Sequence, residues 1–330
     1  MNTMHAIVAT PAGPDLRSVP VPEPGAKQVL VKVQAAALNR ADLGMLRGAS
    51  HGAAGGEGVP LGLEWAGEIV ATGEGVTRWQ PGDKVMAAAG GAFAEYALGH
   101  EARIYPVPDR LSWEQAATFP VALQTEHDAL ITHGQMQPGA RVLIQGASSG
   151  VGLMGMQIAR QLGAALVIGT STSADKLSRL TDFGAHLAIN TRDEDWVSQV
   201  LDATGGQGVD VLIDHVSGAL ANTSMQVIRL GGTMVNVGRL GGMHDDFNFD
   251  LHALRRIRYL GVTFRTRSGA EVAEIVEKTT RDLLPLLEAG QLRLPVYRQF
   301  PLADAIEAFA VMQKNQHFGK LLLIPGQTSS

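Results

Sequence analysis

The residues best suited to chemistry form a short turn between an apolar run and an amphipathic stretch. Residues 142–144 are an unbroken Val-Leu-Ile run, typical of a strand buried on both faces. Residues 151–162 repeat apolar or small side chains at helical spacing, and Gly163 provides a stop. The turn between them consists of Ala147, Ser148, Ser149, Gly150, Val151 and Gly152. Free backbone N–H groups at a helix start attract an anion, so this strand–turn–helix predicts a dinucleotide pyrophosphate site rather than an ordinary loop.

The end of the next expected strand, residues 165–169, indicates which dinucleotide is bound. NAD binders place a carboxylate about 20 residues beyond the glycines, where it holds the ribose hydroxyls. This chain has Ser171 and Ser173 there instead of an acid. Lys176 follows closely, and Arg192 comes after a third expected strand. Hydroxyls and cations suit a 2′-phosphate, so the pattern favours NADPH. The alternative is that both cations are solvated surface charges.

Length and charge narrow the class of protein. A chain of 330 residues is long for a single core, so we expect two domains. A net charge of −5 offers no basic surface for nucleic acid or an anionic membrane. No apolar run could span a bilayer, and residues 1–16 lack the pattern of a signal peptide. We therefore expect a cytoplasmic protein that binds neither nucleic acid nor membrane.

Cysteine is absent from the chain, and its 10 histidines are scattered without metal-ligand spacing. The missing thiols exclude disulfides, a catalytic thiol and any thiolate metal site. The sequence therefore predicts an enzyme site without zinc.

Two patterns of secondary structure follow one another along the chain. Up to residue 120, short strand-like runs alternate with Gly and Pro turns, at residues 5–9, 28–37, 64–72 and 84–87. Ser112 with Gln115 forms a capping box that predicts a helix start. Strands expected at 142–145, 165–169, 187–190, 210–214 and 232–237 alternate with helices, which predicts a doubly wound parallel sheet. Helices at about 270–289 and 302–314 and a strand at 320–324 complete the expected elements.

Several segments along nearly the whole chain also occur in one recognisable order: residues 36–43, 61–70, 79–84, 91–96, the turn, 264–268 and 317–323. Together they resemble the zinc-independent medium-chain dehydrogenase/reductases of the NADPH:quinone oxidoreductase family. The segment Phe-Arg-Thr-Arg-Ser at 264–268 resembles the inducible quinone reductase subgroup. The resemblance implies an α/β chain with a GroES-like, β-rich catalytic domain at residues 1–120 and 260–330 and a Rossmann domain at 121–259. It further implies an active site between the domains and a homodimer.

The resemblance carries individual site residues over to this chain. Asn39, Asp42 and Thr125 would lie near the reacting atoms. Further positions that would line the cofactor are Val216, Val237, Gly238, Phe264, Arg265, Thr266 and Lys320. Relatives with a catalytic zinc carry Cys where this chain has Asn39 and His where it has Leu63. Both of those ligands are therefore replaced.

Some of these side chains have two candidate roles. Asn39 could donate an amide N–H to a developing oxyanion, or it could organise its loop, as we expect of Asp42. His127 could donate a proton, or it could be an ordinary helix residue. Arg265 could line the cofactor or serve a structural role. The glycine-rich residues 48–58 are expected to border the substrate entrance.

Without a metal to polarise a simple ketone, the acceptor must accept hydride readily. We therefore expect an NADPH-dependent reductase that transfers hydride to a quinone or another activated carbonyl such as an enone. The alternative among enzymes is an NADPH-dependent 2-enoyl reductase, which is weakened because none of the four tyrosines lies in the Asn39 loop. A non-catalytic NADPH-binding or sensing protein is the third reading, and turnover would separate it from the other two.

Overall fold

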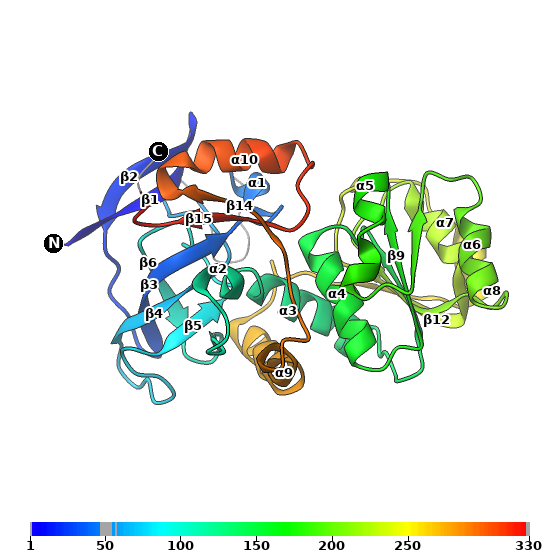
Figure 1. Cartoon of the computed structure of the whole chain (residues 1–330), viewed down its shortest axis with the longest axis horizontal. Helices are drawn as coiled ribbons and strands as arrows, with labels where there is room; N and C mark the ends of the chain where they lie inside the picture. Colours follow the sequence, from blue (N-terminus) through cyan, green and yellow to red (C-terminus); the bar gives the residue numbers. More distant parts are fainter. Residues whose placement is uncertain (1, 47–54, 57, 328–330) are drawn as a thin grey trace. The chain divides into compact units, whose positions relative to one another are not determined.

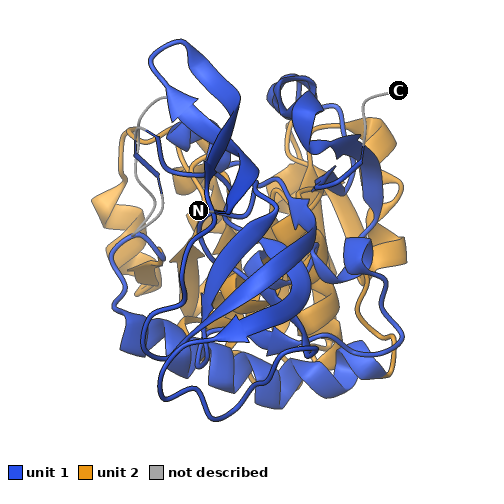
Figure 2. Ribbon diagram, turned by 90° about the vertical axis from the view of Figure 1, so that its left-hand side faces the viewer, with its two compact units in different colours: residues 1–121, 264–288, 294–330 blue, residues 122–263, 289–293 orange. Residues whose placement is uncertain are grey.

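Residues 2–46, 55–56 and 58–327 are described by a computed structural model (Figure 1). They belong to two compact units, drawn in different colours in Figure 2. Unit 1 comprises residues 1–121, 264–288 and 294–330, and unit 2 comprises residues 122–263 and 289–293. The sequence predicted domain boundaries after residues 120 and 259, and the structure has boundaries between its units after residues 121 and 263. The expected α/β class, a β-rich part and a parallel sheet with helices, is confirmed.

Unit 2 is built on six parallel strands, hydrogen-bonded in the order β10-β9-β8-β11-β12-β13. These strands are β8 (Arg141–Gln145), β9 (Leu166–Ser171), β10 (Leu187–Asn190), β11 (Val209–Asp214), β12 (Ile228–Asn236) and β13 (Arg258–Gly261). Strands β8, β9 and β11 are mostly buried, which explains their apolar runs. The strand order reverses at β8, and open α/β sheets bind ligands at the carboxyl ends of strands beside such a reversal.

Helix α4 (Gly150–Gln161) connects β8 to β9 and packs against both. It begins where Ser149 Oγ accepts the N–H of Gly152 at 3.1 Å and ends before Gly163, whose φ is +90°. Further helical segments of unit 2 are α3 (Pro120–His127, starting at the unit boundary), the π-helical η1 (Asp128–His133), α5 (Ala174–Leu177), η2 (Leu180–Phe183), α6 (Trp196–Ala203), α7 (Leu220–Gln226) and α8 (Phe249–Arg255).

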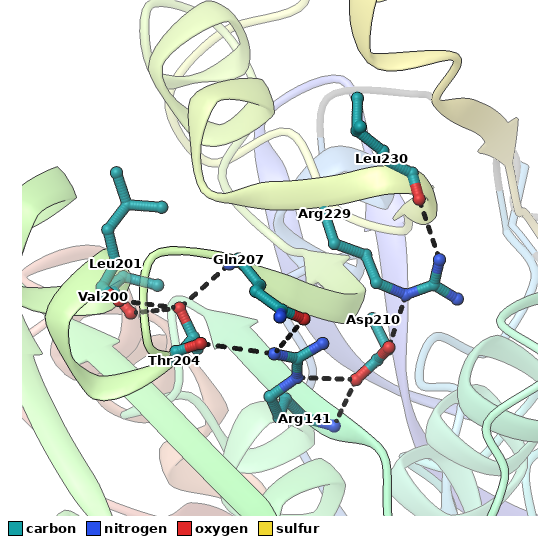
Figure 3. Close-up of polar contacts among 9 residues, drawn as sticks. Arg141, Val200, Leu201, Thr204, Gln207, Asp210, Arg229 and Leu230 are labelled. Carbon is teal, nitrogen blue, oxygen red and sulfur yellow. Dashed lines mark hydrogen bonds and ion pairs between the residues drawn. The ribbon is translucent and has the colours of Figure 1, made fainter.

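A network of charged side chains lies at the amino ends of strands β8, β11 and β12 of this sheet (Figure 3). Asp210 of β11 accepts the backbone N–H of Arg141 at 2.8 Å and its Nε–H at 3.1 Å, and Arg229 of β12 binds the second carboxylate oxygen. Arg141 also donates to the carbonyl of Thr204 at 3.3 Å. Partial burial would raise the pKa of Asp210, but the hydrogen bonds from Arg141 outweigh it and lower the pKa. This network stabilises the sheet at the end opposite to the carboxyl ends of its strands.

Unit 1 contains a mixed sheet in the order β14-β15-β3-β4-β5-β7, with β6 paired to β3, and a separate β1-β2 hairpin. Its strands are β1 (Thr3–Thr10), β2 (Gly13–Pro20), β3 (Gln28–Ala37), β4 (Trp65–Thr72), β5 (Lys84–Ala87), β6 (Tyr96–His100), β7 (Tyr105–Pro106), β14 (Val296–Pro301) and β15 (Lys320–Ile324). Trp65 and Phe93 lie fully buried in its core, and Phe93 meets Phe309 edge to face.

The helices of unit 1 are short except for α9. They are α1 (Asp42–Met45), α2 (Trp113–Ala116), α9 (Gly269–Glu288), η3 (Leu302–Asp304) and α10 (Ala305–Gln313). The predicted capping box is confirmed at α2, where Ser112 and Gln115 each bind the other's backbone N–H. Among the described residues, no helix combines the length and apolar character needed to cross a membrane.

Candidate functional site

The turn after β8 has the close-packed geometry of a phosphate cradle. Ser149 Oγ both caps α4 and donates to the carbonyl of Gly146 at 2.9 Å. A Cβ on Gly152 would lie 2.6 Å from Ala147 Cα, so only glycine lets the helix start this close to the strand. The cradle therefore offers backbone N–H groups at the N-terminus of a 12-residue helix, where an anion is stabilised.

A buried polar network holds this turn in place. Gln145 accepts a hydrogen bond from the Thr170 hydroxyl and donates its own amide to Ser224 Oγ at 2.9 Å. Thr170 in turn accepts the N–H of Gly146 at 3.2 Å and, through its carbonyl, the N–H of Ala147 at 2.9 Å. Three elements, β8, β9 and α7, thus fix the backbone that would face the nucleotide.

The expected 2′-phosphate residues cluster at the ends of β9 and β10. Ser171 donates its hydroxyl to Ser148 Oγ at 3.1 Å, which joins the strand end to the turn. Asn190 of β10 is the register partner of Ser171, and Arg192 donates its backbone N–H to the Asn190 side chain. Arg192 is exposed, and Lys176 in α5 is half-buried. This edge carries hydroxyls and cations, as the sequence indicated, and the NADPH assignment stays a prediction.

The loops after β11 and β12 contain further predicted cofactor positions of unit 2. Asp214 Oδ1 accepts the N–H groups of Val216 at 2.8 Å and Ser217 at 2.9 Å, so the chain turns sharply after β11. The Asp214 carbonyl accepts the N–H groups of Val237 and Gly238. The predicted cofactor positions 216, 237 and 238 are therefore tied to one another through a single residue. Burial raises the pKa of Asp214, against the hydrogen bonds from Ser217 and Val216.

Next to the end of β11 lies a buried ion pair that sequence analysis did not identify. His215 Nε2 lies 3.0 Å from Glu126 Oε1, and the two side chains are 3% and 0% exposed. Burial alone would lower the pKa of His215, but the Glu126 carboxylate raises it above its usual value. The flanking residues Thr125 and His127 are buried in α3. The one signal in the sequence was the acidic residue next to Thr125, in a helix that begins with four apolar residues, 120–123.

Unit 1 brings together Asn39, Glu64 and Lys320. They lie at the ends of three adjacent strands, since β3 pairs with both β4 and β15. Lys320 Nζ lies 2.6 Å from Glu64 Oε2 and 2.8 Å from Asn39 Oδ1. The Asn39 amide donates to Glu64 Oε2 at 3.0 Å and to a backbone carbonyl at 3.3 Å. Because its amide hydrogens have these acceptors, the arrangement favours the loop-organising role of Asn39.

Asp42 anchors the same loop, as expected. Its carboxylate accepts the backbone N–H of Asn39 at 2.6 Å, and the residue is 1% exposed. Burial raises the pKa of Asp42 to about 7, although the Asn39 N–H and the Lys320 charge oppose the shift. Burial also raises the pKa of Glu64, against the Lys320 ammonium. Burial thus disfavours ionisation of both carboxyl groups, and at Glu64 the adjacent Lys320 ammonium opposes this effect.

The remaining expected site residues divide between the units. Phe264, Arg265 and Thr266 belong to unit 1, together with Asn39 and Lys320. Thr125, His127 and the nucleotide turn belong to unit 2. Of the glycine-rich segment 48–58, only residues 55, 56 and 58 are among those described.

Two protein-family models match the chain. The model described as "Alcohol dehydrogenase GroES-like domain" matches residues 25–109, and the model described as "Zinc-binding dehydrogenase" matches residues 150–281. They fall on the β-rich part of unit 1 and on the parallel sheet of unit 2.

Relatives and solved structures extend the match over nearly the full chain. A highly reducing polyketide synthase, apmlA of Arthrinium phaeospermum, is 31% identical over 91% of this chain, which spans only 12% of that protein. A quinone oxidoreductase of Pseudomonas syringae pv. Tomato DC3000 superposes with a TM-score of 0.87 at 27% identity, covering 98% of this chain and 100% of that one. The CurK enoyl reductase superposes with a TM-score of 0.84 at 26% identity, covering 98% and 99%.

Zinc does not fit the cluster of unit 1, despite the name of the second model. The chain has no cysteine, and the Lys320 ammonium lies between the oxygen atoms of Asn39 and Glu64. A fixed positive charge there repels a divalent ion. No group of three or more His, Cys, Asp or Glu side chains in the described part of the chain could hold a metal.

Proposed function

Because the chain belongs to the medium-chain dehydrogenase/reductase family, we propose that it transfers hydride from NADPH to a conjugated carbonyl compound. The observation that carries this proposal is the Lys320 ammonium, hydrogen-bonded to Asn39 and Glu64. Because this fixed charge disfavours a divalent ion, the site suits an acceptor whose own conjugation spreads the negative charge that hydride brings.

The residues of unit 2 fit the cofactor. The cradle at 147–152 would hold the pyrophosphate at the start of α4. Ser148 and Ser171 would meet the 2′-phosphate, with Lys176 and Arg192 to balance its charge. The backbone at 216 and 237–238 would line the nicotinamide end. When bound, the cofactor supplies the hydride, and the chain's own residues bind and orient it.

The first candidate acceptor is a 2-enoyl thioester. The polyketide synthase relative and the CurK enoyl reductase support this choice, which places enoyl reduction ahead of the quinone that the sequence alone ranked first. In this reading, residues near Asn39 would orient the thioester carbonyl.

The second candidate acceptor is a quinone, favoured by the Pseudomonas syringae quinone oxidoreductase and by residues 264–268. One experiment separates the two. Purified protein is mixed with NADPH or NADH and either a crotonyl thioester of N-acetylcysteamine or an ortho-quinone, and nicotinamide absorbance is followed. We expect NADPH-dependent reduction of the thioester, with slower use of NADH. Turnover of the quinone alone would favour the second candidate, and binding of NADPH without turnover of either would contradict the reductase proposal.

A further inference from the structure

We propose that the buried Glu126–His215 ion pair is a positioning device that fixes the nicotinamide-side backbone of unit 2 and thereby sets the affinity for the dinucleotide. The inference rests on the proposed function for the identity of the ligand, but its structural part applies to the protein without cofactor.

His215 lies at the junction of the segments that would line the cofactor. Its N–H donates to the carbonyl of Gln145, directly before the nucleotide turn, and its carbonyl accepts the N–H of Leu240 at 3.3 Å. A Cβ on Gly146 would lie 3.4 Å from His215 Cβ, and one on Gly238 would lie 2.5 Å from the His215 carbonyl oxygen. One residue therefore touches the turn after β8 and the loop after β12.

The imidazole extends from this junction to Glu126 in α3, next to Thr125. The 3.0 Å contact between Nε2 and Oε1 joins a helix to the end of β11 across the interior of unit 2. Separating a buried charged pair is costly, because neither group can exchange its partner for water. Such a pair selects one position of the β11 end over nearby alternatives.

Gly155 of α4 adds a constraint at the second carboxylate oxygen of Glu126. A Cβ at position 155 would lie 2.2 Å from Glu126 Oε2. The glycine thus makes room for the carboxylate, and α4 is the helix whose start forms the cradle. Glu126 is held between α4 and His215, so a shift of either one is transmitted to the other.

The pair is not explained by stability alone. The Asp210 network already links β8, β11 and β12 at the amino end of the sheet. Asp214 already closes the turn after β11. What Glu126 and His215 add is a link from these strand ends to α3 and α4, the helices that carry Thr125 and the cradle.

The test uses two variants and a matched control in the full chain. Glu126→Gln keeps the shape but removes the charge, and Gly155→Ala displaces the carboxylate without altering either partner. Asp210→Asn weakens the ion-pair network at the far end of the same sheet. Dissociation constants for NADPH come from calorimetric titration, thermal unfolding reports stability, and hydrogen exchange of amides 214–218 and 237–240 is followed without cofactor.

We expect both site variants to raise the dissociation constant for NADPH on the order of tenfold to a hundredfold and to speed exchange in both segments. Asp210→Asn should lower the melting temperature without either effect. In a Glu126→Ala background, the Gly155→Ala change should have no further effect on affinity, because the carboxylate it displaces is gone.

Unchanged affinity and unchanged exchange in Glu126→Gln would overturn the inference, as would effects of Asp210→Asn equal to those of Glu126→Gln. If the wild-type protein bound no nicotinamide dinucleotide, the proposed function would fail instead. The exchange data would still decide whether the pair holds these segments.

Discussion

The Lys320 ammonium and the Glu64 carboxylate lie 2.6 Å apart, although 256 positions separate them along the chain. Both side chains are buried, at 6% and 0% exposed. Glu64 directly precedes β4 and Lys320 begins β15, the two strands on either side of β3, so the pair forms only when the C-terminal strand β15 has paired with β3.

Breaking this pair should destabilise the folded chain strongly. Lys320→Met leaves the Glu64 carboxylate buried beside Asn39 without its cation, and we expect the free energy of unfolding to fall by about 3–5 kcal/mol. Urea unfolding measures the change. Glu307→Gln, at the exposed Arg298–Glu307 pair, should cost less than about 1 kcal/mol. The double variant Lys320→Met/Glu64→Gln should lose less than the sum of its parts, and strict additivity would argue against the coupling.

Asp42 should make stability depend on pH. Its pKa is raised from 3.8 to about 7 in the folded chain, so folding favours the protonated form. The stabilisation is full below about pH 3.8 and is lost as the pH rises through 7. Asp42→Asn still accepts the Asn39 N–H but does not ionise. We expect the variant to gain stability relative to wild type between pH 5 and 8, on the order of 1–4 kcal/mol, in urea unfolding at each pH. A pH-independent difference would contradict the assignment.

Cofactor preference should reverse when an acid is placed at the end of β9. Ser171→Asp brings a carboxylate next to Ser148, where it would repel a 2′-phosphate and accept ribose hydroxyls. We expect the ratio of NADPH to NADH affinity to fall on the order of a hundredfold, measured by fluorescence titration. Ser178→Asp, an exposed position after α5, is the control. An unchanged ratio in Ser171→Asp would remove the phosphate assignment.

Edge strand β13 predicts a homodimer. Among the described residues its one partner strand is β12, and the partly exposed Tyr259 stacks on Phe247. Phe247 in turn meets Phe249 of α8 edge to face, and Phe249 and Leu254 are exposed. Light scattering coupled to gel filtration should give about twice the 34.9 kDa of one chain. Tyr259→Asp should shift the protein to monomer, whereas Tyr297→Asp on β14, an edge strand of the separate sheet in unit 1, should not. A monomeric wild type would refute this prediction.

The sequence predicted those elements whose signals are local. The strand–turn–helix before Gly163 was predicted from an unbroken apolar run and a helical stripe of apolar residues, and both are seen in β8 and α4. The capping box of Ser112 and Gln115 has the same local character. Strand β14 was not expected, since three of its six residues are charged, polar or proline and only pairing with β15 makes it a strand.

The sequence predicted the parts of the candidate site that lie close together along the chain, and it missed contacts between distant segments. The cradle and the β9 end lie within one βαβ unit, so their residues could be read from spacing. Glu126 in α3 and His215 directly after β11 come into contact only in the folded chain. The residues around each of them in the sequence do not indicate the other. Resemblance named Asn39 and Lys320 separately, but their shared partner Glu64 emerged only from the sheet order.

Gly155 has an evolutionary consequence. Because the space beside its α-carbon is filled by the Glu126 carboxylate, an alanine at 155 displaces this carboxylate and is accommodated best by a shorter side chain at 126. A shorter side chain at 126 in turn removes the buried partner of His215. Across homologous chains these three positions should therefore change together, and a lineage that loses the histidine first should later accumulate larger residues at 155.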